Sequence, residues 1–349
     1  MYRVPTNIFD MGDNMKFIRN SLLVSVFLLV TSLGVLAQDA KEPLTIYSAR
    51  REELVAPIIE RFTEDTGIAV EVRYGNLAEM VAMILEEGDE SPADVFFTQD
   101  ASGLGALARE ERLIPLSDDL LERVPERFRS DDGLWVGISG RARVAIYNPT
   151  LIEADDLPAS LLDLTDEKYR GMVGWAPTNG PFQGQVTAIR VLLGDEVAKA
   201  WVEGMLANDV VTFPENTAVV QAVVDGEVAI GLVNHYYLNE FRAENPDIDA
   251  ENHYFEAEDV GALVNVAAAG VLDSSDQPEE AQAFIEYLLS PDAQTYFATE
   301  TYEYPLISGI DTIEGLLPLD ELKPPAVDLS SLDDLEGTIA LMQEAGALP

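Results

Sequence analysis

The sequence predicts an α/β fold of two lobes joined as a hinged clamshell, each lobe a mixed sheet with flanking helices. Three observations predict it. Short β-rich runs alternate with stretches of helical periodicity, the 349 residues suffice for about two domains, and no linker or internal repeat separates them. We expect residues 44–142 with 268–318 to form the N-terminal lobe and residues 143–267 with 319–349 the C-terminal lobe, with hinge strands crossing twice.

The N-terminal lobe begins with strands and helices in strict alternation. We expect strands over 44–50, 68–75 and 93–100, and helices over 52–67 and 76–88. Ligands bind at the carboxyl ends of the strands in open α/β sheets. These ends present Ser48 to Arg51 and Thr98 to Asp100.

The C-terminal lobe is expected to start with two short β segments joined at Gly140, within residues 135–148. A buried strand then precedes the adjacent Tyr236 and Tyr237, and a strand over 261–272 returns the chain to the first lobe. Helices are expected over 183–193, 196–208, 278–290 and 291–300.

The charge is strongly negative, with 63 acidic and 21 basic residues and a formal net charge of −42. The acidic residues occur in every segment, so we expect an acidic surface all round, which argues against a nucleic-acid partner. Adaptation to a salty medium, where salt screens self-repulsion, explains this composition; attraction of cations is the alternative.

The N-terminus has the layout of a secretory signal. A short basic region from Met15 precedes an apolar run over residues 21–37 that ends in small residues. We therefore expect residues 1–37 to be a signal peptide with an upstream extension, cleaved after Ala37, and the mature protein to be periplasmic. An uncleaved membrane anchor is the alternative. The chain has no cysteine, which excludes disulfides, thiolate metal sites and a cysteine nucleophile.

Two adjacent tyrosines are the most unusual local feature. Neighbouring side chains point to opposite faces of a strand and lie about 100° apart on a helix, so Tyr236 and Tyr237 are not an ordinary core pair. Asn234 and His235 come immediately before them. Two tyrosines at the rim of a cleft can also hold an organic ligand by stacking, and that alternative stays open.

The sequence resembles the periplasmic ferric-ion-binding proteins of bacterial iron ABC transporters over nearly all of the mature chain. The resemblance rests on "SPADVFFTQD" and "LVNHYY" at the right separation, together with "LTIYSARREELVAPIIERFTEDTGI", "SGRARVAIYN", "GMVGWAPTNGPFQ", "FPENTAVVQAVVDGEV" and "EYPL". It implies the two-lobed type II periplasmic binding protein fold. It also implies that Tyr236 and Tyr237 are the paired ligands of Fe(III), a hard cation that favours anionic oxygen.

The resemblance further implies that an exogenous anion, carbonate or phosphate, completes the iron site. Thr178 to Pro181, including Asn179 and Gly180, match the anion loop before a helix, whose free amides suit an anion. Asn216 and Asn234 match residues that donate to the anion or orient the tyrosine loop. Taken alone, each asparagine could equally be a turn or cap residue.

The sequence departs from part of the family. Arg51 and Gln99 stand where one subgroup has a histidine and a glutamate ligand, and Phe182 stands where another has a tyrosine. An arginine cannot ligate iron but binds oxyanions. We expect Arg51, with Arg143 or Arg50, to neutralise the anion; Asp100 and Tyr47 are second candidates for the ligand shell. We expect His235 to point away from the site and His253 to lie at the surface.

The predicted function is the solute-binding component of an iron importer that works with an ABC permease and its ATPase, as a monomer. An enzyme is disfavoured, because the chain has no metal-binding histidine pair, no G-x-S-x-G and no Walker motif. The alternative within the same fold is a carrier of a free oxyanion or small organic anion. Arg51 and Gln99 favour it, and the paired tyrosines argue against it.

Overall fold

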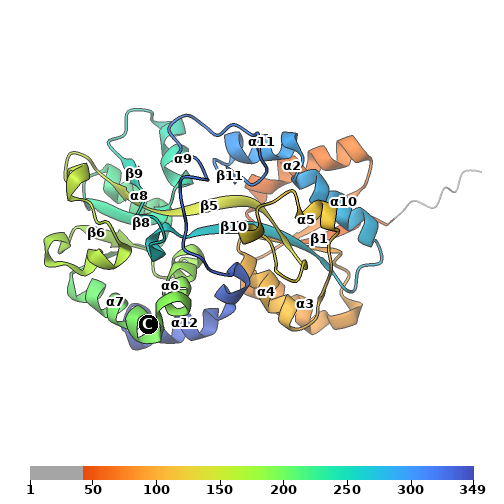
Figure 1. Cartoon of the computed structure of the whole chain (residues 1–349), viewed down its shortest axis with the longest axis horizontal. Helices are drawn as coiled ribbons and strands as arrows, with labels where there is room; N and C mark the ends of the chain where they lie inside the picture. The colour runs from red at the N-terminus through yellow and green to blue at the C-terminus, as the bar shows by residue number, and fades with distance from the viewer. Residues whose placement is uncertain (1–41) are drawn as a thin grey trace, which may run out of the picture. The chain divides into compact units, whose positions relative to one another are not determined.

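A computed structural model describes residues 42–349, and Pro43–Pro349 form one compact unit (Figure 1). The expected signal peptide over 1–37 lies outside the described residues. No helix within 42–349 is both long and apolar enough to cross a membrane.

The described residues form a mixed sheet whose main path runs β2-β1-β3-β10-β5-β8-β6-β7, with β4, β9 and β11 paired at its sides. β1 pairs in parallel with β2 and β3, and β6 pairs in parallel with β7 and β8, while β5 and β10 are antiparallel to their neighbours. The strands are β1 Leu44–Ala49, β2 Val70–Tyr74, β3 Val95–Thr98, β4 Leu113–Ile114, β5 Val136–Tyr147, β6 Val173–Trp175, β7 Val211–Thr212, β8 Ile230–Asn234, β9 Glu251–His253, β10 Val264–Leu272 and β11 Tyr304–Pro305.

β5 connects the two halves of this sheet. Its first part, up to Ala142, pairs with β10 and β11, and its second part, from Arg143, pairs with β8 and β9. The expectation of two short segments joined at Gly140 is wrong, because one continuous strand runs through this glycine. A Cβ at Gly140 would lie 3.1 Å from the Cβ of Tyr304, so the glycine permits close approach of β11 and does not make a turn.

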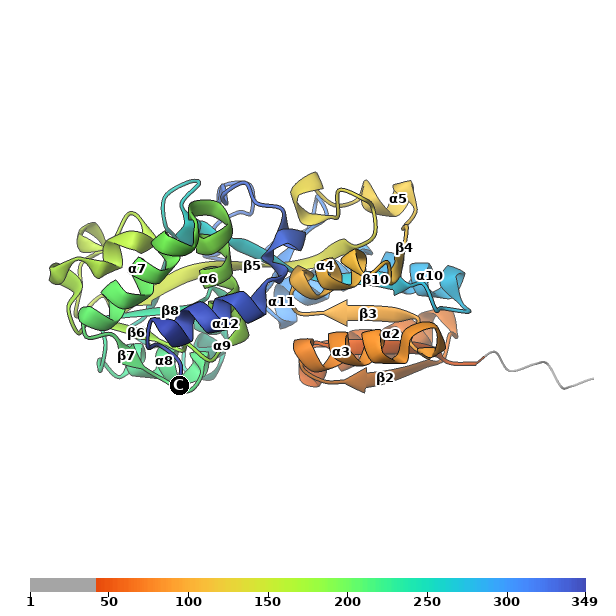
Figure 2. The same cartoon turned by 90° about the horizontal axis from the view of Figure 1, so that it is seen from below.

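Helices cover both halves of the sheet (Figures 1 and 2). α2 and α3 form where expected; α2 buries Val55, Ile58, Ile59 and Phe62 and ends at Gly67, whose φ of 74° suits glycine. The helices are α2 Glu52–Thr66, α3 Leu77–Glu87, α4 Ala101–Arg109, α5 Asp118–Leu121, α6 Gly180–Leu193, α7 Asp195–Ala207, α8 Asn216–Val224, α9 Tyr236–Glu244, α10 Pro278–Leu288, α11 Pro291–Glu300 and α12 Leu335–Glu344.

Residues 328–344 bring the end of the chain back against both halves of the sheet (Figure 2). A 3-10 turn over Leu329–Asp333 packs on α4, where a Cβ at Gly105 would lie 2.5 Å from the Ser330 oxygen. Asp333 pairs with Arg109 of α4 at 2.7 Å, and Asp334 pairs with Arg190 of α6 at 2.9 Å. This terminal segment therefore contacts residues expected in both lobes, and the exact lobe boundaries stay a prediction.

Candidate functional site

The paired tyrosines lie where β8 ends and α9 begins. Asn234 is the last residue of β8, and Tyr236 and Tyr237 open the first turn of α9. Their ring centroids are 4.5 Å apart with the planes tilted by 35°. Both rings are largely buried, at 4% and 8% exposure, and both line a cleft. The change from strand to helix thus brings two consecutive phenols to one wall.

This cleft has a volume of about 620 Å³, and α3, α4, α6 and α9 all begin at its wall. Asn76 caps α3 by accepting from the Glu79 amide, and Asp100 caps α4 by accepting from the Ser102 amide. Free amides and the positive ends of helix dipoles favour negative charge. The cleft combines these helix starts with the two phenols, and its polar lining residues are Arg50, Arg51, Asn76, Gln99, Asp100, Ser102, Thr178, Asn179, Gln183, Thr187, Tyr236 and Tyr237.

The Tyr236 hydroxyl is held in its protonated form in the absence of a ligand. Burial raises the pKa of Tyr236 above its ordinary value, and the neighbouring Tyr237 raises it further. The Arg141 guanidinium and the Asn234 amide, which donates to the Tyr236 oxygen at 3.4 Å, oppose this rise in pKa. A ligand that takes the phenolate must therefore displace a proton.

The expected anion loop lines the same cleft as the tyrosines. Thr178 to Pro181 line the cleft, and Asn179 precedes α6, whose first residue is Gly180. A Cβ at Gly180 would meet no atom within 4 Å, so the space above it is open. Asn216 is buried and does not line the cleft; its amide donates to Asn179 Oδ1 at 3.1 Å. Asn216 therefore contacts the cleft only indirectly, through its hydrogen bond to Asn179.

Arg143 and Asn234 lie behind the tyrosines and not among the residues that line the cleft. Arg143 is 3% exposed and donates from Nη1 to Asn234 Oδ1 at 3.1 Å and from Nε to Gln185 Oε1 at 3.0 Å. Both residues line a smaller cavity that also contacts Arg141.

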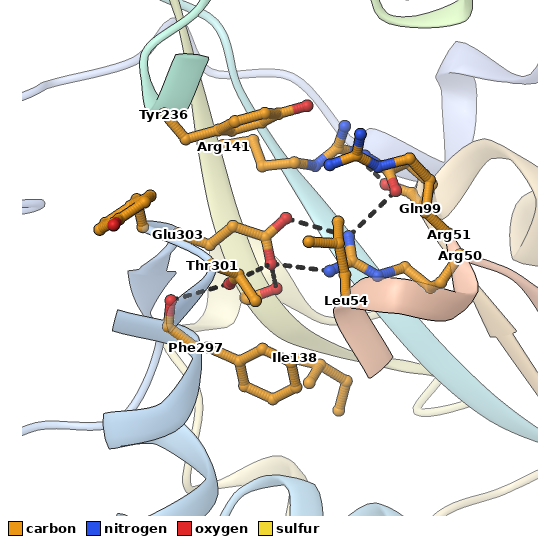
Figure 3. Close-up of polar contacts among 12 residues, drawn as sticks. Arg50, Arg51, Leu54, Gln99, Ile138, Arg141, Tyr236, Phe297, Thr301 and Glu303 are labelled. Atoms are coloured by element: carbon orange, nitrogen blue, oxygen red, sulfur yellow. Dashed lines mark hydrogen bonds and ion pairs between the residues drawn. The ribbon is translucent and has the colours of Figure 1, made fainter. Parts of the chain in front are cut away.

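Arg50 and Arg51 differ sharply (Figure 3). Arg50 is 2% exposed and binds Glu303 through two hydrogen bonds of 3.0 and 2.8 Å, and it also donates to Gln99 Oε1 at 3.1 Å. The side chain of Arg51 is 46% exposed and pairs with Glu240 at 3.3 Å and Glu53 at 3.5 Å. Arg51 is therefore the accessible positive charge of the cleft, whereas Glu303 already neutralises Arg50.

Tyr47 and Asp100, the second candidates for the ligand shell, differ in their position relative to the cleft. Tyr47 does not line the cleft, and its hydroxyl donates to Glu87 at 3.0 Å, so it is not brought to the site. Asp100 lines the cleft, but its carboxylate accepts from the Ser102 amide and the Asn265 side chain. Phe182 is fully buried and packs edge-on against Trp175 at 5.3 Å.

Both histidines serve the structure. His235 is fully buried; its Nδ1 accepts from the Ala142 amide at 3.2 Å, and its Nε2 contacts the Tyr302 carbonyl at 2.9 Å. Burial lowers the pKa of His235 to about 4, so the ring is neutral, and it faces away from the cleft as expected. His253 was expected at the surface; it is half-buried in β9 instead, 2.7 Å from the Pro158 carbonyl.

Two buried charged residues next to the candidate site were missed by the sequence analysis. Glu303 is 253 positions from Arg50 in the chain, so no local pattern connects them. Arg141 alternates with Arg143 on β5, and the two-residue period of a strand places both on the same face. That period could have identified Arg141.

Comparisons with known proteins show the family of this chain. Residues 47–295 match the family described as bacterial extracellular solute-binding protein. The chain belongs to that family. It is 33% identical over 338 residues, covering 95% of this chain and 99% of the relative, to the Fe(3+)-binding periplasmic protein of Serratia marcescens. It is 31% identical to the major ferric iron-binding protein of Neisseria meningitidis, over 89% of this chain and 95% of that protein.

Solved structures give the same result for the fold. Iron-bound HitA from Pseudomonas aeruginosa matches with a TM-score of 0.81 and 36% identity, over 87% of this chain and 99% of that chain. The Trichodesmium protein solved in complex with iron and citrate ligands matches with a TM-score of 0.76 and 29% identity, over 87% and 99%. The predicted two-lobed periplasmic binding protein fold and the predicted resemblance to ferric-binding proteins are thereby confirmed. Within residues 42–349, no group of three or more histidine, aspartate or glutamate residues is placed to hold a metal ion.

Proposed function

We propose that this protein binds Fe(III) in the cleft through the phenolates of Tyr236 and Tyr237 and delivers it to an ABC permease and its ATPase. The observation that carries the proposal is the stacked phenol pair at the start of α9, 4.5 Å between centroids and open to the cleft. Phenolate oxygen suits a hard trivalent cation. The relatives named as ferric-iron-binding proteins support the same cargo.

Iron binding requires loss of the phenol protons. Burial and Tyr237 keep the pKa of Tyr236 above its ordinary value, so the phenolate forms only when the ferric ion replaces the proton. Asn234 fixes the Tyr236 oxygen through its hydrogen bond of 3.4 Å, and Arg141 favours the ionised form electrostatically. These groups hold the ligand oxygen in place before iron arrives.

An exogenous anion, carbonate or phosphate, completes the coordination in this proposal. The amides at the start of α6, with Asn179 and the open space over Gly180, favour an anion there. Arg51 supplies the accessible charge, and Gln99 supplies a side-chain amide on the same cleft. Asn216 holds Asn179, while Arg143 and Asn234 contribute from behind the tyrosines.

The carrier role needs no catalytic residue. We propose that the protein is exported, cleaved after Ala37, and acts as a monomer in the periplasm. Its two lobes, divided at residues 142/143, 267/268 and 318/319, close around the cargo as hinged binding proteins do.

Visible spectroscopy tests the proposal. We expect the mature protein from Gln38, given a weak ferric chelate and bicarbonate, to develop a tyrosinate-to-iron charge-transfer band. The Tyr236→Phe, Tyr237→Phe double variant removes both phenol oxygens and should lose the band and the iron. Tyr254→Phe, a variant of a tyrosine outside the cleft, is the matched control and should keep both.

A second candidate is transport of a free oxyanion or small organic anion, which the charge of Arg51 and the neutrality of Gln99 favour. Wild-type protein that retains no iron and shows no band, but binds phosphate or a carboxylate, would replace the ferric proposal with this one. If the wild-type protein does bind iron, repeating the titration without carbonate and then with phosphate identifies the anion that completes the site.

A further inference from the structure

Two buried arginines behind the tyrosines form no ion pair of their own. The carboxylates that act on this region already accept from other residues: Glu303, which interacts with Arg141, accepts from Arg50, and Asp100, in the shared cavity, accepts from Ser102 and Asn265. Arg141 and Arg143 lie on the same face of β5 and are 2% and 3% exposed. Their recorded hydrogen bonds go to neutral oxygens: Arg141 donates to the Gln99 carbonyl, and Arg143 donates to Asn234 and Gln185. Neither forms an ion pair within 4.0 Å among the described residues. By contrast Arg50, which is equally buried, forms an ion pair with Glu303 through Nη1 and Nη2, although its Nε also has no acceptor.

Several donors of this cluster have no partner at all. Arg141 Nε, Arg143 Nη2 and Gln185 Nε2 are buried polar atoms without a hydrogen-bond acceptor. Burial lowers the pKa of Arg143 only to about 10, so its side chain stays charged at neutral pH. A buried charge without a partner is strongly destabilising, and buried donors normally have acceptors. A negatively charged acceptor bound at this cluster would therefore stabilise the folded protein.

A small cavity lies at this place, beside the larger cleft, with which it shares Asp100 and Pro181. It is lined by both arginines, Asn234 and Asn265, with Asp100, Pro181 and Leu263. Its volume is about 10 Å³, which is room for one water-sized group. Asp100 is the one carboxylate of the lining, and it already accepts from Ser102 and Asn265. Chloride is only slightly larger than a water molecule, whereas carbonate, phosphate and carboxylates are much larger, so a monatomic anion is the charged group closest in size to this cavity.

We propose that the iron-free protein binds a chloride ion between Arg141 and Arg143, in a site separate from that of the anion that completes the ferric centre. Chloride accepts the free N–H groups of both guanidiniums and offsets one of their two charges, while Asp100 offsets the other. A bound water would accept the same hydrogen bonds but would leave the charge uncompensated. The site belongs to the protein without its cargo, so its existence does not depend on iron binding.

Two measurements on iron-free protein test the chloride site. In crystals grown with sodium bromide, we expect an anomalous bromide peak in the Arg141–Arg143 cavity, retained when phosphate is added to fill the larger cleft. In solution, we expect Tm to be a few degrees higher in sodium chloride than in sodium gluconate at equal ionic strength, because a ligand that binds only the native state stabilises it. The equal sodium concentration removes the effect of screening the acidic surface.

Variants make the test specific. Arg141→Gln removes one of the two guanidiniums that line the cavity, so we expect it to abolish the chloride dependence of Tm. Arg143→Gln should also lose the dependence, and the control Arg170→Gln, an arginine with a half-exposed side chain elsewhere, should keep it. Equal Tm in the two salts for wild type, with no bromide peak, would mean that the cavity holds water only and would overturn the proposal. A negative ferric spectrum alone would leave the chloride result untouched.

Discussion

Arg50 and Arg51 are consecutive residues that lie in opposite environments. Arg50 is buried and bound through two hydrogen bonds to Glu303, which also accepts from Ser139 at 2.7 Å and Thr301 at 3.3 Å. Arg51 reaches the cleft with its side chain 46% exposed, and its ion pairs with Glu53 and Glu240 are open to water. Arg50 joins β1 to the segment before β11, whereas Arg51 presents an exposed, ion-paired charge at the cleft.

The difference shows that charge on the cleft wall cannot be judged from residue type. The two guanidiniums have the same intrinsic charge, but a buried carboxylate neutralises the first before any ligand arrives. Arg51 and its exposed partners Glu53 and Glu240 form the rim of the cleft. Arg51 can exchange these partners for a ligand at low cost in free energy, because exposed ion pairs contribute little to stability. The buried hydrogen bonds of Arg50, Ser139 and Thr301 to Glu303 lie beneath Arg51, stay fixed, and hold this part of the cleft wall in place.

Glu303→Gln should give the largest effect, because it leaves Arg50 buried and without its counter-charge. We expect a loss of about 3–5 kcal/mol in the free energy of unfolding, measured by denaturant titration of iron-free protein. The matched control is Glu53→Gln, the same chemical change at the exposed partner of Arg51, which should stay within about 0.5 kcal/mol. Equal losses in the two variants would show that the buried network does not differ from the rim.

The pH dependence of iron binding separates the network from the ligands. Arg50 and the other hydrogen-bond donors around Glu303 hold the pKa of this carboxyl below its ordinary value despite burial, so the pair stays ionised at neutral pH. The pKa of Tyr236 is raised, so each bound ferric ion must displace its proton. Ferric affinity should therefore rise with pH, by about tenfold per pH unit for each phenol proton released.

Calorimetry in buffers of different ionisation enthalpy counts those protons. We expect about two protons per iron for the wild type and one fewer for Tyr237→Phe, after correction for the protonation of the added anion. Over about pH 6 to 8 the contribution of the Arg50–Glu303 pair to stability should stay constant. An affinity independent of pH would argue against phenolate ligation.

The sequence predicts regular elements and local chemistry well, and contacts between distant segments poorly. The apolar periodicity of α2 and the stop at Gly67 are local signals, and so is the pair of tyrosines after a buried strand. The continuity of β5 through Gly140 depends on β11, which approaches from more than 160 positions away. The Arg50–Glu303 pair likewise joins residues far apart in the sequence. Only the folded chain therefore reveals that Arg51, and not Arg50, is accessible.

Arg51→Gln tests the other side of the comparison. Because its ion pairs are exposed, we expect a change in the free energy of unfolding of less than about 1 kcal/mol. Loss of the accessible charge should weaken anion-dependent iron retention by about ten- to a hundredfold, since a charge-assisted hydrogen bond to the anion contributes about 1.5–3 kcal/mol. Arg51→Lys, which keeps the charge but not the planar fork, should recover part of the loss in a competition assay with citrate. Iron retention equal to that of the wild type would remove Arg51 from the site.

The smallest effect is expected at the terminal segment, where Asp333 and Asp334 pair with Arg109 of α4 and Arg190 of α6. In each pair one side chain is well exposed and the other is only 11% or 12% exposed, so each pair should contribute about 1 kcal/mol. Asp333→Asn should lower stability slightly at low salt and have no effect at about 1 M salt, where screening removes the ion pair. Asp334→Asn should behave in the same way, because asparagine keeps the cap of α12 that Asp334 forms with the Gly337 amide. A salt-independent loss of several kcal/mol in the free energy of unfolding at either position would show that this segment resembles the buried Glu303 network and not the exposed pairs of Arg51. The terminal segment would then be a third fixed connection between the two halves of the sheet, besides β5 and β10, and closure of the cleft would depend on it.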